Sequence, residues 1–257
     1  MCELFGVSSS EKVEPREMLK EFFSHSVRHP NGWGMAVFYG NAVSLEKEPI
    51  SAFKSAYLKE RLRHRIEARN MIAHIRQATR GNTDYENCHP FVMRDNADRT
   101  WTLAHNGTIF DCPMLDGYIH AQEGMTDSER ILCHIIAMAD ERQMRLGRAL
   151  DAGERFALVD KVICDVAPHN KLNLLIYDGE QLYVHTNYAN SLYVRRKAGT
   201  AFFATVPLDG GIWQPVPFTT LLAFRDGKQV FSGTNHGHEY RDNPDDLRLV
   251  FLDYAGL

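Results

Sequence analysis

The order of the apolar patterns constrains the fold of this chain most strongly. Short apolar runs typical of strands alternate with helical patterns over residues 1–110, and long helical stretches begin at 126 and cover 151–166. Strand-like runs return over 171–231. Strands, then helices, then strands again indicate antiparallel sheets with helices packed outside them. The pattern predicts an α+β fold, with residues 1–257 forming one domain.

Several segments before residue 80 carry clear local patterns. GWGMAVFYGNAVSLEKE predicts two strands that turn at Gly40-Asn41. Apolar residues recur at a spacing of four from Leu58 to Ile66, which predicts an amphipathic helix over 54–70. The run NMIAHIRQ at 70–77 predicts a buried strand.

Composition excludes several classes of protein. The net charge of −4 gives no reason to expect a nucleic-acid or membrane partner, and no apolar run approaches the ~18 residues of a membrane span. The first residues lack the pattern of a secretory signal, so we expect a cytoplasmic protein. Five unpaired cysteines form neither a disulfide framework nor a metal motif. We therefore expect no metal and no cofactor.

Cys2 is the first candidate for chemistry. It is either a small apolar residue in an N-terminal strand or, once Met1 is removed, a terminal nucleophile. A terminal cysteine carries a thiol and a free α-amine, which together form a nucleophile and its own base. Its position alone leaves both interpretations open.

The HNG segment also supports two compatible interpretations. Asn106-Gly107 between apolar runs predicts a tight hairpin turn. The same turn would expose the Gly107 backbone N–H beside the Asn106 amide, and two such donors can stabilise an oxyanion.

Two charged residues occupy unusual positions. Arg76 falls inside the apolar strand at 70–77, where it either points outward or binds a carboxylate bidentately. TDSE matches a capping box with Thr126 as N-cap, which places Asp127 in the first helical turn. Asp127 then either interacts favourably with the positive end of the helix dipole or binds an ammonium group.

Taken together, these fragments are specific. Cys2, NGWG at 31–34, HIRQATRG at 74–81, HPF at 89–91, HNG and TDSE resemble the class II glutamine amidotransferases, which are N-terminal nucleophile hydrolases. The likeness is closest to the small stand-alone members and covers most of the chain. It implies two stacked antiparallel sheets flanked by helices, an αββα fold. Residues 238–257 have no evident counterpart and form a C-terminal extension.

The resemblance also implies roles for individual residues. Cys2 corresponds to the nucleophile, Asn106 and Gly107 to the oxyanion hole, Arg76 to the binder of the glutamine α-carboxylate, and Asp127 to the binder of its ammonium. Arg28 falls where relatives carry an arginine beside the nucleophile, although here His29-Pro30 follows instead of glycine. Trp33, Thr79 and His89 are expected in the pocket wall or in the core.

The implied reaction is hydrolysis of the glutamine side-chain amide through a Cys2 thioester. Because the likeness uses nearly the whole chain, we expect any enzyme that accepts the ammonia to be a separate protein. Cleavage of a γ-glutamyl amide in a larger metabolite is the alternative, and a non-catalytic glutamine-binding protein is a third.

Overall fold

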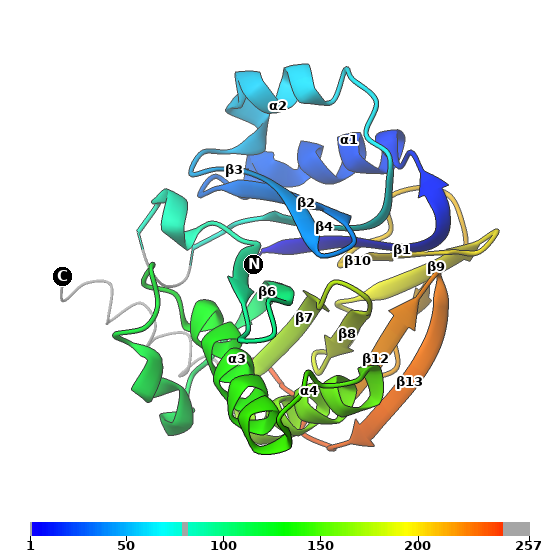
Figure 1. Cartoon of the computed structure of the whole chain (residues 1–257). Helices are drawn as coiled ribbons and strands as arrows, with labels where there is room; N and C mark the ends of the chain where they lie inside the picture. Colours follow the sequence, from blue (N-terminus) through cyan, green and yellow to red (C-terminus); the bar gives the residue numbers. More distant parts are fainter. Residues whose placement is uncertain (1, 79–81, 244–257) are drawn as a thin grey trace.

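Two sheets stacked face to face form the centre of the molecule, with helices on both outer sides (Figure 1). The computed structural model describes residues 2–78 and 82–243. The αββα arrangement expected from the resemblance is confirmed.

The first sheet has the strand order β11-β9-β10-β1-β4-β2-β3, with all its pairings antiparallel. The helices α1 and α2 cover its outer face, together with two 3-10 turns (Figure 1). The elements of this half are β1 (Glu3–Val13), α1 (Arg16–Ser24), η1 (His25–Arg28), β2 (Trp33–Tyr39), β3 (Ala42–Glu48), η2 (Ala52–Lys54), α2 (Ala56–Arg61), β4 (Ala68–Ile75), β9 (Tyr193–Lys197), β10 (Thr200–Ala204) and β11 (Gln214–Pro215).

The second sheet has the order β13-β12-β8-β7-β6-β5 and is also antiparallel throughout. The long helices α3 and α4 cover its outer face (Figure 1). Its elements are η3 (Tyr85–Asn87), β5 (Phe91–Arg94), β6 (Thr100–Thr108), η4 (Pro113–Tyr118), α3 (Asp127–Leu146), α4 (Ala152–Val166), β7 (Lys171–Tyr177), β8 (Leu182–Thr186), β12 (Thr220–Arg225) and β13 (Lys228–Asn235).

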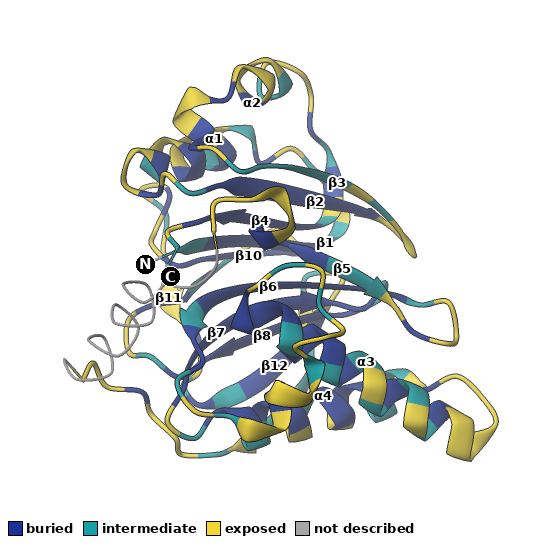
Figure 2. Cartoon of the chain, turned by 90° about the vertical axis from the view of Figure 1, so that its left-hand side faces the viewer, coloured by how far each residue is buried: buried dark blue, intermediate teal, exposed yellow. Residues whose placement is uncertain are grey.

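Three apolar layers hold the four structural layers together. The strands of both sheets are mostly buried (Figure 2). Because side chains alternate along a strand, each strand contributes to two of these layers. On β4, Met71 and Ala73 face the helices and Ile72 faces the opposite sheet. On β7, Leu174 faces α3 and α4 whereas Leu175 faces the first sheet.

The helix predicted over 54–70 is wrong in length. α2 ends at Arg61, and Leu62 is its C-cap residue. Ile66 is buried in the outer core but lies beyond the helix, since β4 begins at Ala68. The spacing of apolar residues continued across a loop that must return the chain to the sheet.

Both long helices begin at side-chain caps. The Thr126 side chain accepts a hydrogen bond from the Glu129 backbone nitrogen at 3.3 Å, as predicted for an N-cap. The Glu129 carboxylate accepts from the backbones of Glu123 and Gly124, so the loop before α3 is held by the residue that the capping-box pattern marks. At α4, Asp151 and Glu154 form a complete capping box.

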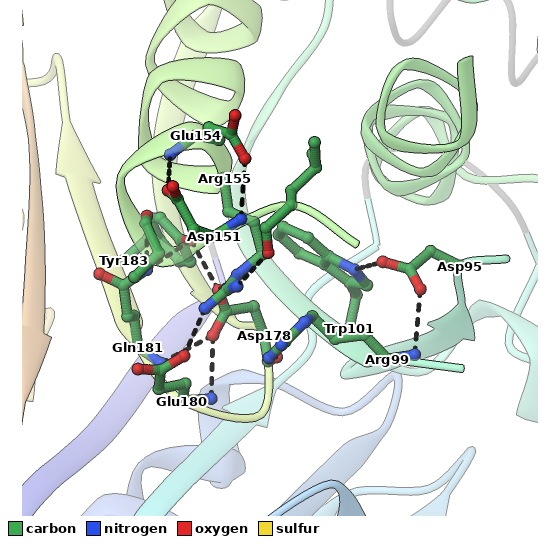
Figure 3. Close-up of polar contacts among 12 residues, drawn as sticks. Asp95, Arg99, Trp101, Asp151, Glu154, Arg155, Asp178, Glu180, Gln181 and Tyr183 are labelled. Carbon is green, nitrogen blue, oxygen red and sulfur yellow. Dashed lines mark hydrogen bonds and ion pairs between the residues drawn. The ribbon is translucent and has the colours of Figure 1, made fainter. Parts of the chain in front are cut away.

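A buried ion-pair network fixes α4 to the turn between β7 and β8 (Figure 3). The Arg155 guanidinium donates to Asp178 at 2.6 Å and to Glu180 at 2.6 Å. Tyr183 donates to the same Asp178 oxygen at 2.8 Å, while backbone N–H groups occupy the other oxygen. Every charge in the buried centre of this network therefore has a partner.

The described end of the chain packs on the second sheet. Tyr240 donates its backbone N–H to the Asn187 carbonyl at 2.8 Å, and its ring stacks on Phe110. Within residues 2–78 and 82–243, no helix is long and apolar enough to cross a membrane, and no three metal-ligating side chains are grouped together.

Candidate active site

The predicted site residues come from the inner faces of both sheets. On β1, Leu4 lies in the layer between the sheets, so alternation places Cys2 on the same face. Ile72 places His74 on the inner face of β4 in the same way, and Ala104 places Asn106 there on β6. Two separate patterns of period two therefore bring the thiol and the amide to the layer between the sheets.

The Cys2 thiol lies against the backbone that follows β4. Its Sγ donates to the Gln77 carbonyl oxygen and accepts from the Gln77 nitrogen, both at 3.3 Å. Burial raises the pKa of the Cys2 thiol, and the contact with Gln77 acts in the opposite direction. The positive charge of Arg76 also lowers this pKa, and the negative charge of Asp127 raises it. Both charges predicted for the site therefore act on the sulfur.

Arg76 follows β4 directly, so the prediction that it lies inside the strand is off by one position. Its side chain is buried, and its Nη1 donates to the Asn82 carbonyl oxygen at 2.8 Å. Asn31 holds the start of the loop after Arg76, since its Oδ1 accepts from the Ala78 nitrogen at 3.0 Å. Thr79, predicted at the pocket wall, lies outside the described residues.

The hairpin predicted at Asn106-Gly107 is wrong. β6 runs through both residues and pairs with β7 along its length, with Gly107 opposite Leu172. A Cβ atom on Gly107 would lie 1.9 Å from the Lys171 carbonyl oxygen and 2.3 Å from His105 Nε2. The glycine is needed for close approach of two strands, not for a turn.

The Gly107 backbone points away from β7. Leu172 uses both its N–H and its C=O for Asn187, so the opposed Leu172 and Gly107 are a non-hydrogen-bonded pair. Pairing of β5 with β6 covers only Thr100 to Leu103, so it ends before Gly107. The Gly107 N–H is therefore directed toward the edge of β6 that no longer pairs with β5.

Asp127 begins α3 and connects it to the end of β6. Its Oδ2 accepts from the Ile109 nitrogen at 2.7 Å, and Ser128 donates to its Oδ1 at 3.3 Å. His105 contacts Ser128 Oγ at 2.9 Å and donates from Nε2 to the Lys171 carbonyl at 2.9 Å. The carboxylate is therefore held beside the strand that carries Asn106.

Two buried histidines lie beneath the site. His74 donates from Nε2 to the His105 carbonyl at 3.2 Å and so connects the two sheets. His89 stacks on His74 with ring centroids 4.2 Å apart. Burial lowers the pKa of His74 to about 3 and that of His89 well below its usual value. Both are therefore neutral, and His89 is a buried residue packed between His74 and Phe91.

Trp33 faces away from the site, and the role of Arg28 stays a prediction. Trp33 is fully buried on the outer face of β2, where it packs edge-on against Phe23 and donates to Glu48. It therefore belongs to the core beneath α1 and α2, and the pocket-wall prediction for it is corrected. Arg28 ends η1 as an exposed residue, and no hydrogen bond or ion pair joins it to Cys2. The structure gives no support to a role for Arg28.

Sequence reasoning missed the residues that hold the site in place. Gln77 positions the thiol through its backbone, and such a contact leaves no side-chain signal. His74 had a readable signal, since it lies two residues before Arg76 in the run predicted as one strand and would share its face. Asn173 could be placed in the same way, because it lies two residues before Leu175 on β7 and shares its face.

Comparisons with known proteins identify the family of this chain. The family model described as "Glutamine amidotransferases class-II" matches residues 1–202. The chain belongs to the class II glutamine amidotransferases. This amidotransferase therefore carries the αββα fold as part of a family of enzymes that act on glutamine.

The relatives come from distant organisms. The amidotransferase is 30% identical over 262 residues to an uncharacterized protein of Methanocaldococcus jannaschii, over 90% of this chain and 71% of the relative. It is 30% identical over 204 residues to a Haemophilus influenzae protein provisionally described as a glutamine amidotransferase, over 77% of this chain and 67% of the relative.

Solved structures share the fold at lower identity. Glutamine phosphoribosylpyrophosphate amidotransferase from Bacillus subtilis gives a TM-score of 0.66 at 19% identity, over 90% of this chain and 48% of that one. The chain thus spans about half the length of that enzyme. A Pseudomonas aeruginosa protein, also provisionally described as a glutamine amidotransferase, gives 0.62 at 21% identity over 90% of this chain and 100% of that one.

Proposed function

We propose that this amidotransferase hydrolyses the side-chain amide of glutamine to glutamate and ammonia through a thioester on Cys2. The main support for this proposal is the position of the thiol, which is held by the backbone of Gln77. The charges of Arg76 and Asp127 both act on this thiol. Removal of Met1 would give Cys2 a free α-amine. An amine of pKa ~7.7–8.0 can take the thiol proton near neutral pH.

The reaction then proceeds in two steps. The sulfur attacks the side-chain carbonyl carbon, and Asn106 and the Gly107 N–H stabilise the negative oxygen. The C–N bond breaks as the Cys2 ammonium returns its proton to the departing ammonia. The free amine next activates a water molecule, which cleaves the thioester, releases glutamate and restores the thiol.

Arg76 and Asp127 carry opposite charges that suit the two ends of a free amino acid. In this proposal Arg76 binds the α-carboxylate and Asp127 the α-ammonium, which fixes the side chain toward Cys2. An amide without that charge pair would not be held. The ammonia is released or passes to a separate accepting enzyme.

The deciding experiment combines intact-mass measurement with a diazoketone analogue of glutamine. We expect Met1 to be absent, and we expect one adduct on the peptide that begins with Cys2. Cys2→Ser should abolish both the adduct and glutamine hydrolysis, whereas the control Cys112→Ser, at another partly exposed cysteine, should keep both. Glutamine turnover by Cys2→Ala at the wild-type rate would contradict the proposal.

A panel of γ-glutamyl amides tests the leaving group. We expect the highest kcat/KM for glutamine itself, because the contacts proposed here bind only the glutamyl part and give a bulkier leaving group no binding energy of its own. Faster cleavage of a larger γ-glutamyl amide would indicate a different function with the same nucleophile. The protein would then be an amidohydrolase that acts on a metabolite and not a source of ammonia for transfer.

A further inference from the structure

Asn106 and Asn173 are directly opposed on the adjacent strands β6 and β7. Both side chains lie on the inner face, since Ala104 and Leu175, two residues away along each strand, belong to the layer between the sheets. Directly opposed residues on one face of an antiparallel pair have Cβ atoms about 4.5–5.5 Å apart. The two side-chain amides are therefore neighbours within reach of one another.

The Asn173 side chain points its amide oxygen toward two hydroxyl groups. Its Oδ1 accepts a hydrogen bond from Thr186 Oγ1 at 2.7 Å and lies 3.2 Å from Ser191 Oγ, whose proton has a closer acceptor in the Tyr188 carbonyl oxygen at 2.6 Å. With the oxygen on this side, the amide presents its Nδ2 in the other direction. Asn173 is fully buried, and its Nδ2 has no hydrogen-bond partner among the described residues.

Asn106 lacks a hydrogen-bond donor for its side-chain oxygen. Its side chain is 4% exposed, and its Oδ1 is buried with no donor in the described part of the chain. A buried amide that leaves a donor or acceptor unpaired is uncommon, and each such group costs stability. Here an unpaired donor and an unpaired acceptor occur on opposed residues of neighbouring strands.

We propose that Asn173 is a positioning residue that orients the Asn106 amide for catalysis. In the catalytic arrangement that we infer, rotation of these side chains brings the Asn173 Nδ2 into a hydrogen bond with Asn106 Oδ1, which fixes the plane of that amide and directs the Asn106 Nδ2 toward the substrate oxygen. A donor already oriented when charge develops stabilises the oxyanion without reorganisation. This inference rests on the oxyanion role proposed above for Asn106.

The test begins with Asn173→Leu and Asn173→Ala, which both remove the amide donor. Thr186 and Ser191 keep an acceptor in each variant, because their hydroxyls also reach the Tyr188 carbonyl oxygen at 3.2 Å and 2.6 Å. We expect kcat for glutamine to fall about three- to thirtyfold, less than the ~10²–10³ expected for loss of a whole donor. KM should stay within about twofold, because Asn173 does not contact substrate.

The control is Thr102→Val. Thr102 lies on the same face of β6, is fully buried and also has an unpaired hydroxyl among the described residues, but it opposes Tyr177. We expect this variant to keep wild-type kcat. A loss equal to that of Asn173→Leu would assign the effect to general disturbance of the inner layer and overturn the proposal.

A double-mutant cycle with Asn106→Ala separates positioning from support of the sheet. If Asn173 acts through Asn106, its replacement changes kcat less than about twofold once Asn106 is alanine. An equal loss in both backgrounds, or no loss in either Asn173 variant, overturns this inference alone. Wild-type kcat in Asn106→Ala itself would instead overturn the proposed oxyanion role.

Discussion

The Sγ atom of Cys2 lies 3.3 Å from both the nitrogen and the carbonyl oxygen of Gln77. These contacts tie the second residue of the chain to the segment that carries Arg76. β1 and β4 are paired as neighbours, with Glu3 opposite Ile75, so the first residues follow the register of the sheet. A chain end that would otherwise fray is held at the position where the proposed reaction needs its nucleophile.

The charges around this thiol predict how its reactivity changes with mutation. Asp127→Asn should lower the pKa of Cys2 and speed its alkylation at pH 8, because the carboxylate raises that pKa. Arg76→Gln should slow the alkylation, because the guanidinium favours the thiolate. Iodoacetamide labelling of the N-terminal peptide, followed by mass spectrometry, measures both rates.

Lys20→Gln is the matched control for the loss of a positive charge, since Lys20 is exposed on α1 and pairs with Glu17. It should leave the labelling rate of Cys2 unchanged. Equal rates in the Arg76 and Asp127 variants would show that neither charge acts on the sulfur.

Gly107→Ala should damage both the fold and the site. The added methyl group would meet the Lys171 carbonyl oxygen at 1.9 Å, so β6 and β7 must separate locally. We expect a loss of about 1–3 kcal/mol in the free energy of unfolding, as for overpacked cores, and a fall in kcat. Urea titration and glutamine turnover measure the two effects.

Gly117→Ala provides the comparison, because a Cβ atom at Gly117 meets nothing within 4 Å. It should leave stability and turnover unchanged. Wild-type stability in Gly107→Ala would mean that the two strands are not as close as the structure places them.

Local sequence patterns were sufficient for the sheets but not for the site. Alternating apolar residues predicted β2 and β3 with their turn at Gly40-Asn41, and Thr126 marked the start of α3. The same local rule failed at Asn106-Gly107. A hairpin signal records only which backbone angles the two residues tolerate, whereas here the glycine serves contact with a strand more than 60 residues later.

Local patterns also did not predict which face of a sheet a buried side chain occupies. Trp33 and His74 both lie in apolar strands, but Trp33 faces the outer helices and His74 faces the opposite sheet. Choosing between the two faces requires knowing which sheet covers the strand. The family resemblance supplied roles for Arg76 and Asp127 without that knowledge, because it carries the whole fold with it.

Acid should destabilise the protein through its buried histidines. His185 donates from Nδ1 to the Leu172 carbonyl, and its Nε2 lies 3.0 Å from His236 Nε2. Burial, together with His236, lowers the pKa of His185 to about 3. The unfolded chain takes up the proton near pH 6.5, so stability is highest above that value and falls as the pH drops toward 3.

His185→Gln should flatten this dependence. Each such histidine contributes up to about 1.4 kcal/mol per pH unit, so the stability loss between pH 6.5 and 5 should shrink by as much as about 2 kcal/mol. Urea titrations at several pH values measure it. His64→Gln, at an exposed histidine, is the control for the change of residue type. If the free energy of unfolding of wild type and of His185→Gln changed with pH in parallel, the buried imidazole of His185 would not be neutral.

The Arg155–Asp178 pair predicts a large cost for removing one buried charge. Asp178→Ala leaves the guanidinium with the Leu150 carbonyl and with Glu180, whose side chain is 37% exposed. We expect a loss of about 3–5 kcal/mol in the free energy of unfolding, because the buried guanidinium loses its only fully buried charged partner among the described residues. The double variant Arg155→Met with Asp178→Leu should recover much of that loss, since it removes both charges together.

The surface pair Lys161–Asp165 on α4 is the matched comparison, as both residues are one helical turn apart and solvent reaches them. Lys161→Met should leave the urea midpoint unchanged within scatter, because exposed pairs contribute little. If Asp178→Ala were equally mild, α4 would be held by its apolar face alone. The ion pair would then serve only to fix the register of α4 against the turn between β7 and β8. We expect kcat to stay unchanged in Asp178→Ala and in Lys161→Met.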